Sequence, residues 1–196
     1  MMKNNSNVIP YRLKFLQSGR TCGSNRLLLA LGANISGAWG QPKDTLLRSL
    51  RELSGAGLPP LCCSPFFRTR PLGTRPQPDF LNAVVLTQAT GAPAQLLRLV
   101  KGLERRAGRR PGPAWGPRPL DIDILDYGGR RLGWPPTPQR RGRLILPHPE
   151  AHRRAFVLVP LAQVAPRWRH PVFGATARTL LGRLGWKGRH DLAPSP

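Results

Sequence analysis

The order in which short apolar runs and amphipathic segments follow one another is the strongest constraint on the fold of this chain. Apolar runs typical of strands alternate with two segments that carry leucine or valine at helical spacing. The predicted strands cover 26–31, 61–69, 81–87 and 120–127, and the predicted helices cover 45–53 and 93–107. This strand–helix–strand–strand–helix–strand order is the split βαβ pattern of a ferredoxin-like α/β sandwich. We therefore expect an α+β fold with a mostly antiparallel sheet and the helices packed on one face of it.

The rest of the chain gives weaker signals. Residues 143–146 are predicted as a short strand, 155–159 form an apolar segment, and 176–184 could form a last short helix. We expect one domain over 27–184, followed by a C-terminal tail at 185–196.

The first 26 residues differ in composition from the rest of the chain. They carry five basic side chains and no acidic one, without clear periodicity. A disordered basic tail, a start codon assigned too far upstream, and a targeting peptide all fit this composition. We favour a disordered or artefactual tail over a targeting peptide.

The net charge of +22 has more than one explanation. It comes from 31 basic and 9 acidic residues, and only five of the basic residues are lysines. A nucleic-acid partner would explain it. So would a GC-rich coding bias, which favours Arg, Gly and Pro together, and a polyanionic substrate would also favour a basic cleft. The charge alone therefore decides little.

Cysteine usage and hydropathy favour a cytoplasmic protein. The three cysteines are Cys22, Cys62 and Cys63, with no CxxC pair, so a zinc site built on cysteine is not expected. Cys62 and Cys63 should lie on opposite faces of one strand as reduced thiols. No run of about 18 apolar residues exists, so we expect no membrane helix.

Two carboxylates on one predicted strand indicate a metal site. Asp121 and Asp123 stand two residues apart, so their side chains share a face about 7 Å apart along the strand. Such carboxylates repel each other unless a cation lies between them, and oxygen ligands of this kind suit Mg²⁺ with substrate phosphates. The alternative is a solvent-facing pair on an edge strand.

The neighbours of this pair add groups suited to phosphate chemistry. Arg118 lies between two prolines just before it, Arg109 opens the same loop, and Trp115 offers a flat apolar surface. Phe80 and Asn82 share a face of another strand and offer a stacking surface and an amide. Each of these also has a plain structural explanation. The chain contains no GxxxxGK[ST] motif and no kinase-type glycine loop with its lysine.

The sequence resembles the 6-hydroxymethyl-7,8-dihydropterin pyrophosphokinases of folate biosynthesis. The resemblance covers about residues 27–166, and five motifs in the family's order carry it. They are LALGAN (29–34), FFRTRPLG (66–73), QPDFLNAV (77–84), WGPRPLDID (115–123) and LPHPEAHRRAFVLVPL (146–161). The chain departs from the family at Ala114, where a charged residue is usual, and in a short, Pro/Gly-rich loop before Trp115.

The resemblance implies an enzyme that transfers diphosphate from ATP to the pterin hydroxymethyl group and releases AMP. Asp121 and Asp123 would bind two Mg²⁺ ions and act in catalysis with Arg109 and Arg118. The ATP-binding residues implied are Glu104, Arg109, Trp115, Arg118, Arg143, His148 and Arg154, with Glu104 either reaching the nucleotide or supporting the site. The pterin-binding residues implied are Thr69, Pro71, Leu72, Gly73, Phe80, Asn82 and Phe156.

Two other classes of protein stay open on the residues alone. A nucleic-acid-binding protein would show tight, salt-sensitive binding without ATP turnover. A nucleotidyltransferase with the same pair of aspartates would release pyrophosphate rather than AMP. We expect a monomer that acts on ATP and the pterin, with no specific nucleic acid, no membrane association and no general base except Asp123.

Overall fold

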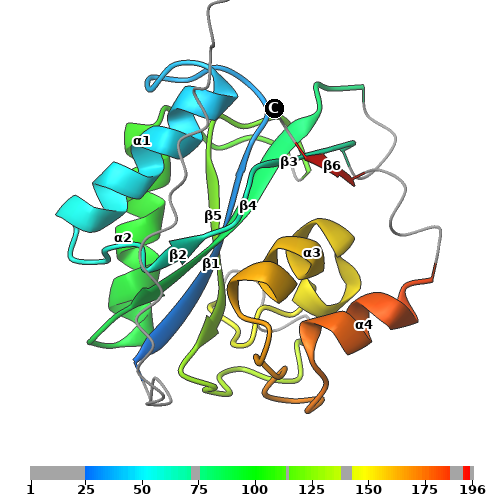
Figure 1. Cartoon of the computed structure of the whole chain (residues 1–196). Helices are drawn as coiled ribbons and strands as arrows, with labels where there is room; N and C mark the ends of the chain where they lie inside the picture. The colour runs from blue at the N-terminus through cyan, green and yellow to red at the C-terminus, as the bar shows by residue number, and fades with distance from the viewer. Residues whose placement is uncertain (1–24, 72–75, 114, 138–142, 186–191, 195–196) are drawn as a thin grey trace, which may run out of the picture.

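The structure is a computed structural model that describes residues 25–71, 76–113, 115–137, 143–185 and 192–194. A six-stranded antiparallel sheet runs through the middle of the molecule, with helices on both sides (Figure 1). The strands are β1 (Arg26–Ala33), β2 (Cys62–Cys63), β3 (Phe67–Thr69), β4 (Phe80–Gln88), β5 (Asp121–Tyr127) and β6 (Leu192–Pro194). The helices are α1 (Pro42–Gly55), α2 (Pro93–Arg106), α3 (Ala155–Val164) and α4 (Ala177–Arg183), with a short 3₁₀ turn at Ala151–Arg153.

The strand order confirms the α+β sandwich expected from the sequence. The order is β5-β1-β4-β3-β6, and β2 pairs with β4 beside this path. Strand β4 thus separates β1 from β3, and β1 separates β4 from β5. Each β–α–β unit is therefore split by a strand of the other unit, which is the predicted arrangement.

Strand β1 is apolar after Arg26 because both of its faces are covered. Leu27, Leu29 and Leu31 pack in the core under α1 and α2. Leu28 packs in a second core with α3 and α4. A strand buried on both faces has no polar alternation, which explains its continuous apolar run.

The helices cover both faces of the sheet, so the expectation of helices on one face holds only for α1 and α2 (Figure 1). Helix α3 comprises the apolar segment that had no assigned structure, and α4 lies within the predicted last helix. Most of α3 is buried, so its sequence lacks the polar face that identifies a surface helix.

Two predicted strands differ from the observed ones. The strand expected at 61–69 is two short strands, β2 and β3, separated around Pro65, which has no N–H for a sheet ladder. Cys62 and Cys63 do face opposite cores, as expected. The strand expected at 143–146 is wrong: Leu146 makes only an isolated bridge with Leu132. Residues 192–194, in the expected C-terminal tail, form β6 against β3.

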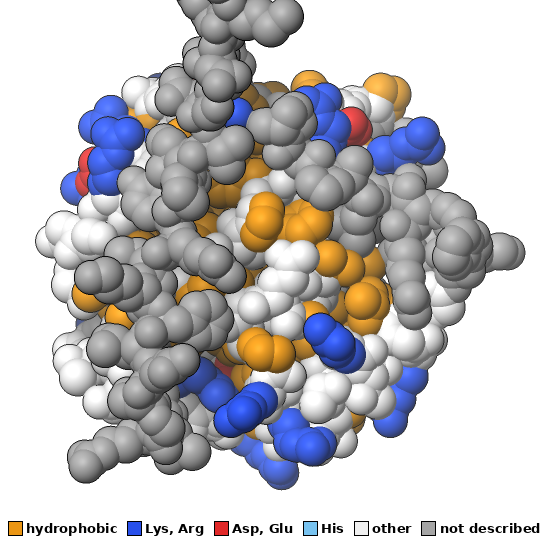
Figure 2. Space-filling view, in the orientation of Figure 1, with side chains coloured by type: hydrophobic (Ala, Val, Ile, Leu, Met, Phe, Trp, Pro, Cys, Tyr) orange, Lys and Arg blue, Asp and Glu red, His pale blue; other side chains and the backbone are white. Residues whose placement is uncertain are grey.

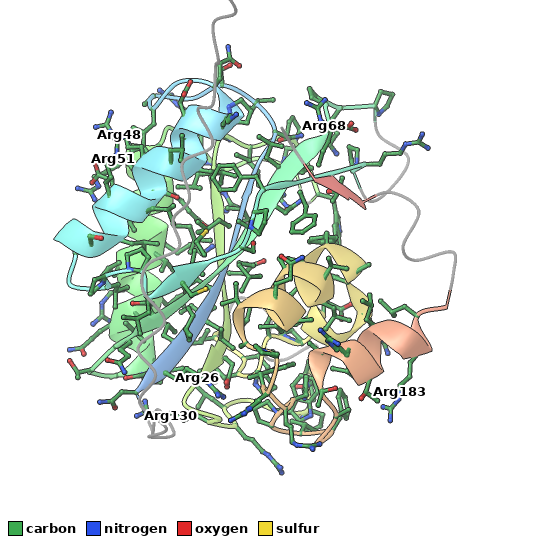
Figure 3. The ribbon with its side chains drawn as sticks, in the orientation of Figure 1. Arg26, Arg48, Arg51, Arg68, Arg130 and Arg183 are labelled. Atoms are coloured by element: carbon green, nitrogen blue, oxygen red, sulfur yellow. The ribbon has the colours of Figure 1, made fainter. Side chains whose placement is uncertain are left out.

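The positive charge is spread over many elements of the described chain. Arg48 and Arg51 project from α1, Arg68 from β3 and Arg183 from α4 (Figure 3). On the face drawn in Figure 2, basic side chains lie in separate groups around apolar and uncharged surface. No helix among the described residues combines the length and the apolar character needed to cross a membrane.

Candidate active site

A cavity of about 310 Å³ lies at one end of the sheet, between the sheet and the start of α3. It brings together eleven of the site residues predicted from the sequence, which come from β3, β4, β5, α3 and the connections between elements. These residues are Thr69, Phe80, Asn82, Arg109, Trp115, Arg118, Asp121, Asp123, His148, Arg154 and Phe156.

The floor of the cavity is a row of three residues on neighbouring strands. Gly32 of β1 pairs with Asn82 of β4 on one side and with Asp121 of β5 on the other. Residues opposite each other in a sheet point to the same face. A Cβ atom on Gly32 would lie 3.1 Å from Asn82 Oδ1, so the missing side chain opens the space between the two polar groups.

The carboxylate of Asp121 lies between two arginines. Arg118 Nε is 2.9 Å from Asp121 Oδ2, and Arg109 Nη1 donates to Asp121 Oδ1. Burial opposes ionisation of Asp121, but the charges of Arg118 and Arg109 outweigh it and lower the pKa of the carboxyl. Asp121 is therefore an anion at neutral pH.

The basic groups around the Asp123 carboxylate lie farther from it than those around Asp121. His148 Nε2 is 3.7 Å and Arg154 Nη1 is 4.0 Å from Asp123 Oδ2. Burial lowers the pKa of His148 although Asp123 opposes this. Because the Glu150 N–H donates to His148 Nδ1 at 3.2 Å, the neutral imidazole carries its proton on Nε2, toward Asp123.

The arginines also face the aromatic residues of the cavity. The guanidinium of Arg118 lies 5.3 Å from the centre of the Phe80 ring. Arg154 lies 5.3 Å from the Trp115 ring and 5.8 Å from the Phe156 ring. These distances are within the range of cation–π attraction. The apolar rings and the charged groups thus form one continuous surface.

The structure places Glu104 behind the cavity wall rather than in it. Its side chain is 3% exposed and accepts from the Ile122 N–H and from Lys101 Nζ, each at 2.8 Å. Arg109 Nη1 is also 2.8 Å from it, so Arg109 bridges Glu104 and Asp121. Burial raises the pKa of Glu104, and these donors oppose the rise. Of its two expected roles, the geometry favours support of Arg109 over contact with a nucleotide.

Other predicted residues are not brought to the cavity. Arg143 is exposed and does not line it, and neither does Pro71. Leu72 and Gly73 lie outside the described residues.

Sequence reasoning missed several residues of the cavity. Lys101 lines it, and its position three residues before Glu104 on α2 could have identified it, because such residues share a helix face. Gly32 was recognised only as part of a motif, and its place between Asn82 and Asp121 depends on strand register.

The carboxylate oxygens in the cavity are ligands of the kind that fits Mg²⁺ bound together with phosphates. Asp121 and Asp123 offer carboxylate oxygens on one face of β5. No three Asp, Glu, His or Cys side chains of the described residues gather into a complete metal site. Magnesium commonly takes one or two carboxylates and completes its shell with water and phosphate oxygens.

The fold is an α+β sandwich, and its cavity gathers basic, acidic and aromatic side chains at one end of the sheet. The comparisons with known proteins identify the family. The family model for 7,8-dihydro-6-hydroxymethylpterin-pyrophosphokinase (HPPK) matches residues 28–166. The chain belongs to this family of folate-pathway diphosphotransferases, which confirms the resemblance carried by the five motifs.

Individual relatives agree with the family assignment. A 2-amino-4-hydroxy-6-hydroxymethyldihydropteridine pyrophosphokinase of Synechocystis sp. is 36% identical over 168 residues, which cover 85% of this chain and 80% of the relative. The mitochondrial folate synthesis bifunctional protein of Arabidopsis thaliana is 36% identical over 140 residues, but the match covers only 23% of that protein. A solved Plasmodium falciparum HPPK-DHPS structure has a TM-score of 0.56 over 81% of this chain and 41% of that chain. Its sequence identity is 16%, so it supports the fold alone.

Proposed function

We propose that this cavity transfers a diphosphate group from ATP to 6-hydroxymethyl-7,8-dihydropterin and releases AMP. The observation that carries the proposal is the row Asn82–Gly32–Asp121 across three strands. It sets a charged half of the cavity, suited to phosphates, directly beside an apolar half suited to a flat heterocycle.

The charged half would hold the nucleotide. The cavity is lined by two carboxylates, Asp121 and Asp123, and by five basic residues, which are Arg70, Lys101, Arg109, Arg118 and Arg154. Arginine forms bidentate bonds to phosphate as readily as to carboxylate. Arg109 and Arg118 can therefore turn from Asp121 to phosphate oxygens, and this would free the carboxylate for a cation.

Asp121 and Asp123 would hold the two Mg²⁺ ions that the family resemblance implies. Bound Mg²⁺ supplies positive charge that neutralises phosphate oxygens and the leaving group. His148 presents an N–H to the same space, so it is suited to donate to a phosphate rather than to accept a proton. Asp123 is the one carboxylate of the cavity with no donor within 3.5 Å among the described residues, so it is the candidate acceptor for the hydroxyl proton.

The other half would hold the pterin. Phe80 and Phe156 offer ring surfaces from the sheet and from α3. Asn82 Nδ2 donates to Thr69 Oγ1 at 2.8 Å, and this bond fixes the amide so that Oδ1 points toward the space above Gly32. A fixed amide oxygen suits a ring that carries N–H donors. The family resemblance adds Pro71, Leu72 and Gly73 to this half.

The reaction needs no covalent enzyme intermediate. The hydroxymethyl oxygen attacks the β-phosphorus of ATP, the bond from that phosphorus to the oxygen of AMP breaks, and the hydroxyl proton leaves. The side chains contribute by positioning the two substrates and by stabilising charge, as in other phosphoryl transfers.

The identity of the nucleotide product tests this function. The protein is incubated with ATP, Mg²⁺ and the hydroxymethyl dihydropterin, and the products are separated by ion-exchange chromatography. We expect AMP and pterin diphosphate in equal amounts, and no AMP when the pterin is omitted. Pyrophosphate with an adenylylated pterin would identify a nucleotidyltransferase instead, and absence of turnover would contradict the proposal.

A further inference from the structure

A turn between α3 and α4 presents an aromatic ring to solvent in a fixed position. The turn covers residues 169–176, and an isolated bridge joins its two end residues. Within it the Gly174 N–H donates to the His170 carbonyl and the His170 N–H donates to the Ala175 carbonyl, each at 2.8 Å. Phe173 lies in this turn and is 45% exposed. The turn is therefore ordered by its own hydrogen bonds, while its largest apolar side chain stays in contact with water.

The ring of Phe173 has one side covered by other rings and one side open. It lies on the His170 ring with centroids 4.4 Å apart and an interplanar angle of 25°. The His152 and Trp134 rings lie 4.9 Å and 6.0 Å from it. Because these three rings are also within 6.5 Å of one another, they lie on the same side of Phe173. A further flat ring can therefore stack on the open side.

Two exposed arginines hold the turn on either side of Phe173. Arg131 Nη2 donates to the Pro171 carbonyl, and Arg169 Nη1 donates to the Gly174 carbonyl at 3.0 Å. A guanidinium carries several N–H donors, so each arginine keeps donors for an oxyanion while the bond to the turn fixes its position. The open ring is thus flanked by two positioned cations.

The charge around this surface favours an anionic occupant. Segments 128–137 and 165–176 together contain four arginines and no aspartate or glutamate. Burial and the charge of Arg153 lower the pKa of the neighbouring His152, against the opposing charge of Glu150. The local field is therefore positive. A second copy of this chain, which also has a net charge of +22, would be repelled from this surface.

We propose that the surface formed by Arg131, Trp134, Arg169 and Phe173, here called the aromatic–arginine patch, binds single-stranded nucleic acid. A base stacks on the open side of Phe173, and the phosphates before and after it pair with the two arginines. Proteins that bind single strands combine these same two elements, stacking rings and basic groups along the backbone. An acidic protein segment would match the charge but would bring no flat ring to the open side. None of the four residues lines the cavity, so this activity goes beyond the proposed function and does not rest on it.

The first test removes the stacking ring. The full chain is titrated into a fluorescein-labelled oligouridylate of about 10 nucleotides, and the dissociation constant is read from fluorescence anisotropy. Saturating Mg²⁺ and α,β-methylene-ATP are present, so that the oligonucleotide does not enter the cavity. Stacking of one base is worth a factor of at least about 5, so we expect Phe173→Ala to weaken binding by at least about 5-fold. Leu61→Ala, at a residue that is 40% exposed, is the matched control and should bind as the wild type does.

The second test removes the two phosphate contacts and does not depend on Phe173. Each phosphate contact to a single strand contributes about 0.7 to the slope of log affinity against log salt concentration. The double variant Arg131→Gln and Arg169→Gln should therefore lower this slope by about 1.4. Arg51→Gln, on α1 across the sheet, is the charge-matched control and should leave the slope unchanged (Figure 3).

Several results would overturn the inference. They are no detectable binding by the wild type, the same affinity for Phe173→Ala as for the wild type, and an equal loss of slope for Arg51→Gln, which would indicate a general attraction to the basic chain. Displacement of the oligonucleotide by poly-glutamate at equal charge would indicate a site for acidic protein segments instead. The rate of AMP formation is measured on the same preparations and reports on the proposed function alone.

Discussion

At the scale of single residues, the cavity depends on one missing side chain. Gly32 has an ordinary negative φ, so backbone freedom does not explain why glycine stands there. The explanation is space: the Cβ of any other residue would press on Asn82 Oδ1, and the Asn82 amide is already fixed by Thr69. The glycine therefore determines how close a ligand can come to the sheet.

We predict that Gly32→Ala weakens pterin binding selectively. The added methyl group must displace Asn82 by a few tenths of an ångström, and small displacements of positioning groups have large kinetic effects. Steady-state kinetics should show the KM for the pterin raised about 10-fold, with the KM for ATP nearly unchanged. Gly55→Ala is the control, since no atom lies within 4 Å of a Cβ there. Equal effects of Gly32→Ala on both substrates would contradict the assignment of the two halves.

At the scale of elements, the sequence allowed β1, β4, β5 and the first two helices to be predicted, from apolar runs bounded by turn residues and from leucines at helical spacing. The prediction failed where an apolar run fits more than one kind of element. Helix α3 is covered on most sides, so its apolar run did not distinguish helix from strand. Residues 143–146 have strand-like composition but no neighbouring strand to pair with beyond Leu132.

The same limit applies to the site. Asp121 and Asp123 were predictable because both lie on one strand, and a period of two places them on one face. Gly32 was recognised only within a motif, because its place between Asn82 and Asp121 depends on which strands pair and in which register. Strand register and loop contacts are not local properties of the sequence.

At the scale of the whole molecule, the stability of the fold depends on pH through a buried histidine that does not line the cavity. His170 is fully buried against Trp168, Trp134 and Phe173. Its Nδ1 accepts from the Val172 N–H at 3.2 Å, so the neutral form is the one this environment fits. Burial, together with the neighbouring His152 and Arg131, lowers the pKa of His170 to about 4.

We predict that acid weakens the fold through His170. The unfolded histidine takes up a proton near pH 6.5 and the folded one only near pH 4, so stability is lost as the pH falls through this window. The free energy of unfolding in urea should fall by about 2 kcal/mol between pH 7 and pH 5 from this group. His170→Gln should remove that part of the pH dependence, and parallel curves for the variant and the wild type would contradict the prediction.

The central claim is that the cavity containing Asp121 and Asp123 performs the transfer. Its most direct test is the rate of AMP formation in a single turnover with Asp121→Asn, Asp123→Asn and the control Asp79→Asn, whose carboxylate is exposed outside the cavity. Removal of one group that stabilises charge in a transition state costs about 10²- to 10³-fold in rate. We predict a loss of at least about 10²-fold for each cavity variant, with unchanged thermal unfolding, and none for Asp79→Asn. AMP formation at the wild-type rate in either cavity variant would contradict the account.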